Sequence, residues 1–466
     1  MSGPAIHPSL PPESWAPARR AARALASPIQ RILAIEASSG LLLMAATVIA
    51  LAWANSPWQG AYEALWHTDI GFHVGSVAFA RPLHFWINDG LMTVFFLVVG
   101  LEIRREIYEG ELQTLRRAAL PLAAALGGML VPAAIYMAFN HGKIGAAGWA
   151  ISMATDIAFA VGVLTLLGSR VPNVLRVLLL SLAVIDDIGA IVVIAAFYTG
   201  GITLYGFGIA AGGLGLVYVM RAAALRHPAA YLVPGAIVWV GLYIAGVHPT
   251  LAGVLLGLMT PVRPWFGAAR FAEATHGHLD GLGGADKADL MVRLDAIERA
   301  RREAVSPVEF LIHALHPHVA YGIMPLFALA NAGVVLGGAD LGGDSLWIFV
   351  GVIAGLAVGK PLGIVGASML ASRIGVATRP PEMWFGGLTL VGMVGGIGFT
   401  MSLFVAQLAF PATTHAAQLD TAKLGILVGS AVAMVIGLGY GVLTLRGRRP
   451  VAPAIDPAGD ADVTSP

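Results

Sequence analysis

The chain has 466 residues, of which 57% are hydrophobic and only 12% are charged, whereas a soluble domain carries about 25% charged residues. This composition excludes an ordinary soluble globular protein and predicts an all-α polytopic membrane protein surrounded by lipid. The chain contains no cysteine, which excludes disulfides and thiolate metal sites. We expect neither a resident cofactor nor a nucleic-acid partner.

Twelve apolar runs follow one another along the chain, and about 20 apolar residues suffice to span a bilayer as a helix. The runs lie at residues 36–54, 84–102, 119–139, 146–168, 174–198, 204–220, 229–245, 247–260, 317–336, 347–371, 385–410 and 422–444. We therefore predict twelve transmembrane helices within a transmembrane domain of residues 33–446. A tail of residues 1–32 precedes this domain, and a disordered tail of residues 447–466 follows it.

The positions of the Lys and Arg residues predict the orientation of the chain in the membrane. All but four of the 28 basic residues fall on one side of a twelve-span topology, the exceptions being Arg81, Lys143, Lys423 and the intramembrane Lys360. Since cytoplasmic loops carry the excess of Lys and Arg, we predict that both termini are cytoplasmic.

Two stretches lie outside the predicted spans. Residues 262–308 form a long cytoplasmic loop, in which residues 285–304 have the pattern of an amphipathic helix. On the opposite side, residues 66–82 alternate loosely between apolar and polar side chains. That pattern predicts an outer β-hairpin or, equally well, an irregular loop.

Four ionisable side chains lie deep in the predicted spans, namely Asp156, Asp186, Asp187 and Lys360. A charge at the bilayer centre costs roughly 2.5–3.5 kcal/mol or more, and the adjacent Asp186 and Asp187 also repel each other. Such a pair requires a cation, protons or a buried basic partner. Lys360 can neutralise one carboxylate, which leaves the others for a cation or protons. The alternative is a purely structural buried ion pair.

Two segments are poorly suited to uninterrupted helices. Pro361 removes a helix hydrogen bond at mid-span, and residues 395–400 read Gly-Gly-Ile-Gly-Phe-Thr. Irregular backbone persists in a membrane only where protein or a water-filled cavity satisfies its polar groups. Helices broken there would offer carbonyl groups and dipole ends to a bound ion. Close helix packing through small residues is the alternative explanation for the glycines.

The available ligands indicate which ion such a site would bind. Carboxylates, hydroxyls and free carbonyls are hard oxygen ligands that suit Na+, Li+ or a proton, whereas a transition metal would require His or Cys. A proton and Na+ that compete for the same oxygens, at a site open alternately to each side, would be exchanged. Such a site predicts low activity in acid, because protons then hold the carboxylates.

At these residues the chain resembles the NhaA-type Na+/H+ antiporters of bacterial inner membranes, and the resemblance extends from about Leu33 to Arg446. The motifs that carry it stand in the family's order: Ile87-Asn88-Asp89-Gly90, Val99-Gly100-Leu101-Glu102, Ala154-Thr155-Asp156-Ile157-Ala158-Phe159-Ala160, Ile185-Asp186-Asp187, Gly246-Val247-His248, Leu315-His316-Pro317, Phe327-Ala328-Leu329-Ala330-Asn331-Ala332-Gly333, Gly359-Lys360-Pro361-Leu362-Gly363 and Gly396-Ile397-Gly398-Phe399-Thr400-Met401-Ser402.

The resemblance implies a role for each candidate site residue. Asp186 and Asp187 would bind the cation and protons, Lys360 would pair with Asp186, and Thr155 would be a further candidate ligand for Na+ or Li+. Helix 4 would break at Thr155 and Asp156, and helix 11 at a segment that includes Gly396, Gly398 and Thr400. Asp156 and Lys360 would balance the dipole ends of these broken helices. Residues linked to the response to pH would be Glu102, Arg105, Glu106, His248 and His316.

The resemblance also implies an activity. The chain would be a secondary transporter with inverted repeats, not an enzyme. It would exchange cytoplasmic Na+ or Li+ for external H+ electrogenically, with activation at alkaline pH, and so serve sodium and pH homeostasis. Family members form homodimers partly through an outer β-hairpin. Two departures touch the pH-sensing region: the segment Leu311-Ile312-His313 lacks the family's acidic residue before the histidine, and the 262–308 loop is longer than usual.

Other readings compete with exchange. A Na+-coupled solute symporter of related fold would need a roomy polar pocket, and Asn331 is the main polar side chain in the spans that suits one. An intramembrane aspartyl protease is disfavoured because the acids follow Thr155, Ile185 and Asp186 rather than standing in Tyr-Asp and Gly-x-Gly-Asp motifs. A passive channel is disfavoured because a buried lysine opposes cation flow.

Overall fold

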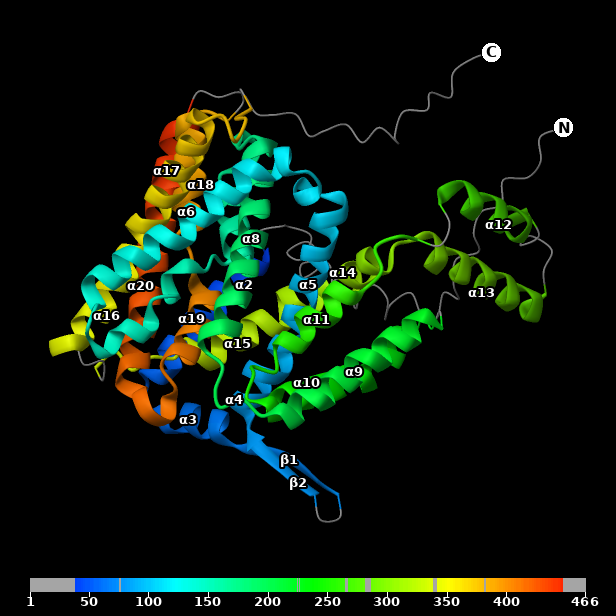
Figure 1. The fold of residues 1–466 in the computed structure, drawn as a ribbon, viewed down its shortest axis with the longest axis horizontal. Coiled ribbons are helices and arrows are strands. Elements are labelled where there is room, and N and C mark those ends of the chain that lie inside the picture. The colour runs from blue at the N-terminus through cyan, green and yellow to red at the C-terminus, as the bar shows by residue number, and fades with distance from the viewer. Residues whose placement is uncertain are drawn as a thin grey trace, which may run out of the picture.

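The computed structural model describes residues 38–74, 77–223, 225, 227–264, 267–280, 286–337, 342–380 and 383–446 (Figure 1). Both predicted tails, residues 1–32 and 447–466, lie outside the described residues. The remainder is almost entirely helical, and helices cover each of the twelve apolar runs, as the composition predicts.

The elements follow one another without long gaps, and η2, η9 and η10 are π-helical segments. In chain order they are α2 (Ser38–Ala54), α3 (Gln59–His67), β1 (Asp69–Val74), β2 (Val77–Pro82), α4 (Leu83–Phe85), η2 (Trp86–Leu91), α5 (Met92–Glu109), η3 (Glu111–Gln113), α6 (Leu115–Asn140), η4 (Ile144–Gly148), η5 (Ile151–Met153), α7 (Ile157–Leu166), η6 (Gly168–Arg170), α8 (Asn173–Phe197), α9 (Leu204–Ala222), η7 (Pro228–Tyr231), α10 (Leu232–Ala245), α11 (Leu251–Met259), α12 (Ala268–Asp280), α13 (Lys287–Ala304), α14 (Pro307–His318), η9 (Val319–Ile323), α15 (Met324–Asn331), α16 (Gly343–Ala354), η10 (Gly355–Gly359), α17 (Lys360–Arg373), α18 (Phe385–Gly395), α19 (Phe399–Ala409) and α20 (Ala412–Leu445).

Length and composition identify the helices that can cross a membrane. Among the described residues there are seven such helical segments, or up to ten if each of three bent pairs counts as one span. Two further predicted spans do not qualify: α11 has only nine residues, and the first half of α14–η9–α15 carries Glu309 and three histidines. The chain is a multi-pass membrane protein, and its twelve-span topology stays a prediction.

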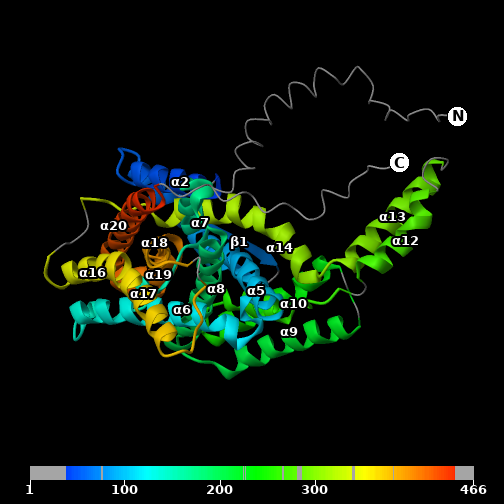
Figure 2. The same cartoon turned by 90° about the horizontal axis from the view of Figure 1, so that it is seen from above.

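The helices form two bundles that lie side by side (Figures 1 and 2). In bundle A, α6 packs against α8, α16 and α17, while α20 packs against α16, α18 and α19, and α7 joins α8 and α18. In bundle B, α5 packs against α11 and α14, α9 against α10, and α2 against α15. The bundles meet where α8 touches α5, α19 touches α15, and α7 touches α2.

A helix is interrupted at residues 395–400, as the sequence predicts, and another at Thr155 and Asp156, as the resemblance implies. The axis bends by 49° between Ile144–Met153 and Ile157–Leu166, and by 47° between α18 and α19. The third bent pair, α2 and α3, turns by 114°. Pro361 does not break its helix: α16, η10 and α17 form one continuous helical segment of 31 residues. The π-helical turn of η10 lies immediately before Lys360, which leaves Pro361 at the start of α17, where its missing N–H costs little.

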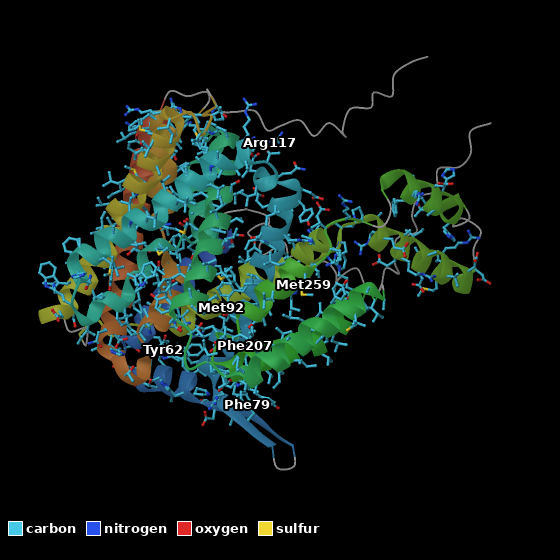
Figure 3. All side chains as sticks on the ribbon, in the orientation of Figure 1. Tyr62, Phe79, Met92, Arg117, Phe207 and Met259 are labelled. Carbon is cyan, nitrogen blue, oxygen red and sulfur yellow. The ribbon has the colours of Figure 1, made fainter. Side chains whose placement is uncertain are left out.

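The segment between α3 and α4 is a two-stranded antiparallel sheet, with Asp69 opposite Pro82 and Val74 opposite Val77. Phe79 packs edge-to-face on Trp86 and Tyr243, with ring centroids 5.7 and 6.1 Å apart. These aromatic contacts join the sheet to α10. Phe79 and Arg117, the latter in the first turn of α6, lie at opposite ends of the molecule (Figure 3).

The predicted amphipathic helix of the long loop is α13, which begins two residues later than expected. Asp286 caps it by accepting a hydrogen bond from the Asp289 N–H at 2.8 Å. It packs against α12, a second helix of the same loop, and the pair projects away from both bundles (Figure 1).

Candidate functional site

The side chains singled out for ion chemistry converge at the helix breaks of bundle A. Asp186 and Asp187 lie at the middle of α8, and Lys360 is the first residue of α17. Thr155 and Asp156 form the break before α7, and Thr400 lies in the first turn of α19. All six are at most 1% exposed. The structure therefore brings these six predicted residues together in one buried centre.

Lys360 makes a fully buried ion pair with Asp186. Its Nζ donates to Asp186 Oδ2 at 2.5 Å and to Thr155 Oγ1 at 2.8 Å. The Thr155 hydroxyl lies 2.7 Å from Asp186 Oδ2 and 2.9 Å from the Gly395 carbonyl oxygen. Because a hydroxyl carries one proton, Thr155 can donate to only one of these acceptors at a time. Lys360 therefore contacts Asp186 directly, and the Thr155 hydroxyl links it to the C-terminal end of α18.

Asp156 holds the N-termini of two half-helices together. Its Oδ1 accepts the Phe159 N–H at 3.0 Å, which caps α7. Its Oδ2 accepts the Thr400 N–H at 3.1 Å and also the Thr400 hydroxyl proton. A carboxylate is favoured at a helix N-terminus because the peptide dipoles leave partial positive charge there. One side chain thus serves the first turns of both α7 and α19.

The glycines of the second break allow close backbone approach, Gly398 to the first break and Gly396 to η10. The Asp156 N–H donates to the Ile397 carbonyl at 2.8 Å, so the two breaks are hydrogen-bonded to each other. A Cβ on Gly396 would lie 2.4 Å from the Leu356 carbonyl oxygen, and a Cβ on Gly398 would lie 2.9 Å from the Ala154 carbonyl oxygen. The glycines are required by backbone approach, because their φ values of −71° and −91° suit any residue.

Two carboxylate oxygens at the centre of the site lack partners. Oδ1 of Asp186 and Oδ1 of Asp187 are buried and accept no hydrogen bond from the described residues. Leaving a buried polar group unpaired costs about 1–3 kcal/mol, and more if the group is charged. The charges of Asp186, Glu102 and Asp156 also act on Asp187. The site is therefore incomplete without protons or a cation.

Most residues linked to pH response by the resemblance lie near one end of α5. Glu106 Oε1 accepts a hydrogen bond from the Ser181 hydroxyl of α8 at 3.1 Å. Arg105 is close enough for its charge to act on the exposed His316 of α14. Glu102, one turn earlier on α5, acts electrostatically on Asp187. The structure thus connects this part of bundle B with the aspartate helix.

His248 is not part of that group. It lies in the turn between α10 and α11, and it interacts with the backbone of Tyr198 at the end of α8. Ser181, which contacts the α5 group, and Tyr198 are about 25 Å apart along the chain at 1.5 Å per residue. His248 therefore lies far from that group. Gly246 makes the turn, with a φ of +78° that only glycine adopts readily.

Sequence reasoning missed a buried polar cluster near the two-stranded sheet, here called the amide cluster and defined as His84, Asn88, Asn331 and Gln407. Asn331 Nδ2 donates to Asn88 Oδ1 at 2.8 Å, and Asn88 Nδ2 donates to Gln407 Oε1 at 2.5 Å. His84 Nε2 lies 2.8 Å from Asn331 Oδ1. Gln407 is an amide within an otherwise apolar run, and that was the available signal.

The site has the ligands of an alkali-cation centre and not those of a transition-metal centre. Among the described residues, no group of three or more His, Asp or Glu side chains could hold a metal ion. A multi-pass helical protein with a carboxylate–lysine pair at two crossing helix breaks belongs to the class of secondary ion transporters.

Comparison with known proteins identifies the family within that class. The family model described as Na+/H+ antiporter 1 matches residues 30–440. The chain is 54% identical over 444 residues to a protein of Sorangium cellulosum named Na(+)/H(+) antiporter NhaA 2, covering 94% of each chain. It is 50% identical over 457 residues to the protein of that name in Myxococcus xanthus, covering 97% of each. The chain therefore belongs to the NhaA family of Na+/H+ antiporters.

A solved structure of the sodium proton antiporter MjNhaP1 from Methanocaldococcus jannaschii aligns with 88% of this chain and 92% of its own. The identity is 12% and the TM-score is 0.49, a similarity too low to support an inference.

Proposed function

We propose that this protein is an electrogenic secondary antiporter that exchanges cytoplasmic Na+ or Li+ for external H+ at Asp186 and Asp187 by alternating access. The observation that carries the proposal is the pair of buried, unpartnered Oδ1 atoms on these adjacent aspartates. Family membership supports Na+ and H+ as the transported ions. The transported cation is the substrate of the site and not a resident cofactor.

The charges of the site favour a monovalent occupant. Lys360 offsets the charge of Asp186, so Asp187 contributes one further negative charge in the same buried space. A single Na+ or Li+ bound by the two Oδ1 atoms would neutralise it, with the Thr155 hydroxyl as a further oxygen ligand. A proton on Asp187 would achieve the same neutrality, which is why cation and proton exclude each other.

Competition of this kind gives the direction of the pH dependence. At low pH the carboxylates hold protons and Na+ finds no ligand, so exchange rises as the pH increases. Asp187 and Lys360 can each release a proton when the cation binds, whereas Asp186 is already ionised in its pair with Lys360. Release of more than one proton per Na+ would move net charge across the membrane, and the proton-motive force would then drive Na+ export. This cycle would serve sodium and pH homeostasis.

The proposed topology has twelve spans, with both termini cytoplasmic, in the bacterial inner membrane. Counting α11 and α14–η9–α15 as spans would complete twelve. The two-stranded sheet would then lie on the outer face and the end of the molecule that bears Arg117 on the cytoplasmic face (Figure 3). A homodimer joined partly through the two-stranded sheet would suit this arrangement, because the aromatic contacts of Phe79 hold the sheet against α10.

The test uses inside-out vesicles in which respiration maintains a pH gradient. Addition of Na+ or Li+, but not K+, should collapse the gradient, and the effect should increase from pH 6.5 to pH 8.5. Asp187→Asn should abolish it. Asp420→Asn is the matched control, because it makes the same chemical change on α20 outside the site. No cation-dependent change at any pH, in vesicles shown to contain the protein, would contradict exchange and would lead to assays of Na+-dependent solute uptake.

A further inference from the structure

The amide cluster joins the two bundles at a point between the charged site and the end of the molecule that bears the two-stranded sheet. Gln407 belongs to α19 of bundle A, whereas Asn88 and Asn331 belong to η2 and α15 of bundle B. Its fourth member, His84, follows the last residue of β2 by two positions. The cluster is therefore located near the sheet, which the proposed topology places on the outer face.

The two asparagines of the cluster are buried, whereas His84 and Gln407 are partly exposed. Asn331 is 0% and Asn88 is 6% exposed. Asn331 Oδ1 lies 2.5 Å from Gln407 Nε2 and 2.8 Å from His84 Nε2, while Asn331 Nδ2 donates to Asn88 Oδ1 and to the Phe327 carbonyl. Separating the bundles here would break the hydrogen bonds of Gln407 to Asn88 and Asn331, which opposes separation even though water can then solvate the amides. The cluster therefore resists separation of the bundles at this end.

The half-helix α19 connects the cluster to the ion site. Thr400 and Gln407 are two helical turns apart on one face of α19, a distance of about 10 Å. Thr400 is bound to Asp156, so one rigid half-helix contacts the charged centre at its first turn and bundle B further along. Movement of Gln407 relative to bundle B would thus move a backbone group that binds Asp156.

An aromatic contact lies on the same face of α19 between these two positions. The Phe404 ring packs against Phe96, with centroids 5.3 Å apart, and against Phe327 at 6.4 Å. Both partners belong to bundle B. Along this face of α19, the apolar rings and then the amide cluster thus lie between the charged centre and the sheet.

The other hydrogen bond described above between the bundles lies toward the opposite end. Ser181 of α8 donates to Glu106, near the end of α5 that leads to η3. Residues at this end precede Arg117, which lies opposite the sheet (Figure 3). The two links are therefore placed on either side of the ion site.

We propose that Gln407, together with Asn88 and Asn331, forms a latch that keeps the ion site closed to the outer side, and that this latch opens when the site turns outward. Gln407 acts here as a positioning residue, because it touches no atom of the ion site. The inference rests on the proposed alternating access. Weakening the latch shifts the population of states toward the outward-open one without changing the ion ligands.

The absence of cysteine from the chain provides a clean test. A single reporter, Leu403→Cys, places a thiol on α19 one turn before Gln407, at a residue that is 0% exposed. Its rate of reaction with a membrane-impermeant methanethiosulfonate added outside spheroplasts measures opening to the outer side. Gln407→Ala in this background removes the latch, and Gln418→Ala, the same change on α20, is the matched control.

Loss of the hydrogen bonds of Gln407 should raise the labelling rate by about tenfold, whereas Gln418→Ala should leave it unchanged. The apparent KM for cytoplasmic Na+ should rise in Gln407→Ala, because fewer sites face that side. Gln407→Met keeps the side-chain length and removes the hydrogen bonds to Asn88 and Asn331, so it should give a similar increase. It also carries the test if Gln407→Ala fails to fold.

An unchanged labelling rate and an unchanged KM in folded Gln407→Ala would overturn the latch and leave the exchange function untouched. Absence of cation-dependent proton movement in the unsubstituted protein would instead overturn the proposed function. The two failures are thereby distinguishable.

Discussion

Removal of the Lys360 charge is the most direct perturbation of the buried centre. Lys360 Nζ lies 2.5 Å from Asp186 Oδ2, and both side chains are 0% exposed. Breaking a buried pair by removing one partner costs about 3–5 kcal/mol, because an uncompensated charge remains in a medium of low dielectric constant. Since Asp187 adds a second like charge beside Asp186, we expect Lys360→Met to lose stability toward the upper end of that range.

The double variant Asp186→Asn/Lys360→Met removes both charges of the pair. Replacing a buried ion pair with uncharged groups of similar volume is often neutral, so the double variant should recover most of the stability. The apparent melting temperature of the purified protein in detergent measures both effects. In Lys360→Met the buried Asp186 can lose its uncompensated charge only by taking up a proton, which the unfolded chain would release again. The folded state thus binds more protons, and the loss of stability grows as the pH rises.

Measurements at pH 6 and pH 8.5 therefore separate this explanation from simple loss of packing, which would not depend on pH. The reasoning would be wrong if Lys360→Met had the same melting temperature as the parent at both pH values, or if the double variant were no more stable than the single one. Either result would mean that the buried pair does not stabilise the fold.

Three further changes address the other parts of the site. Asp187→Asn should leave the melting temperature near that of the parent and make Na+-dependent proton movement in vesicles undetectable; retained exchange would exclude Asp187 as a ligand. Asp156→Asn places an amide N–H opposite the N–H groups of α19, so it should cost about 1.5–3 kcal/mol in thermal stability, and a variant as stable as the parent would contradict the proposed capping of two helices. Gly396→Ala puts a methyl group 2.4 Å from the Leu356 carbonyl oxygen and should cost about 1–3 kcal/mol, whereas Gly439→Ala, which meets no atom within 4 Å, should cost nothing; equal melting temperatures for the two would refute the close approach of the second break to η10.

The sequence predicted the break at residues 395–400 because the physical constraint there is strong. Backbone groups at bilayer depth must be satisfied by the protein, so a run such as residues 395–400 marks a special site wherever it occurs in an apolar segment. Buried charges are equally constrained, which is why Lys360 was expected to neutralise one carboxylate, and the resemblance then implied that this carboxylate is Asp186. Pro361 was a weaker signal, because a π-helical turn just before it absorbs the distortion without interrupting the helix.

The sequence could not predict that the uncharged polar side chains of the amide cluster contact one another. Asn88, Asn331 and Gln407 are separated by many residues in the sequence. A single amide side chain is common in a helix and does not by itself indicate a cluster. Only the packing of α19 against α15 and η2 shows that their hydrogen bonds close on one another. The two-stranded sheet was undecided for a related reason, because cross-strand pairing depends on the aromatic contacts with Tyr243 that no local pattern reveals.

The shared carboxylate of Asp156 has a consequence for how such a protein can evolve. Because one side chain caps both α7 and α19, a change that restores continuity to one helix would leave Asp156 with surplus charge and the other helix without its cap. Neither interruption can be repaired alone. The residues at positions 156 and 400 should therefore vary together among descendants of this sequence, and the two interruptions should be inherited or lost as a single unit.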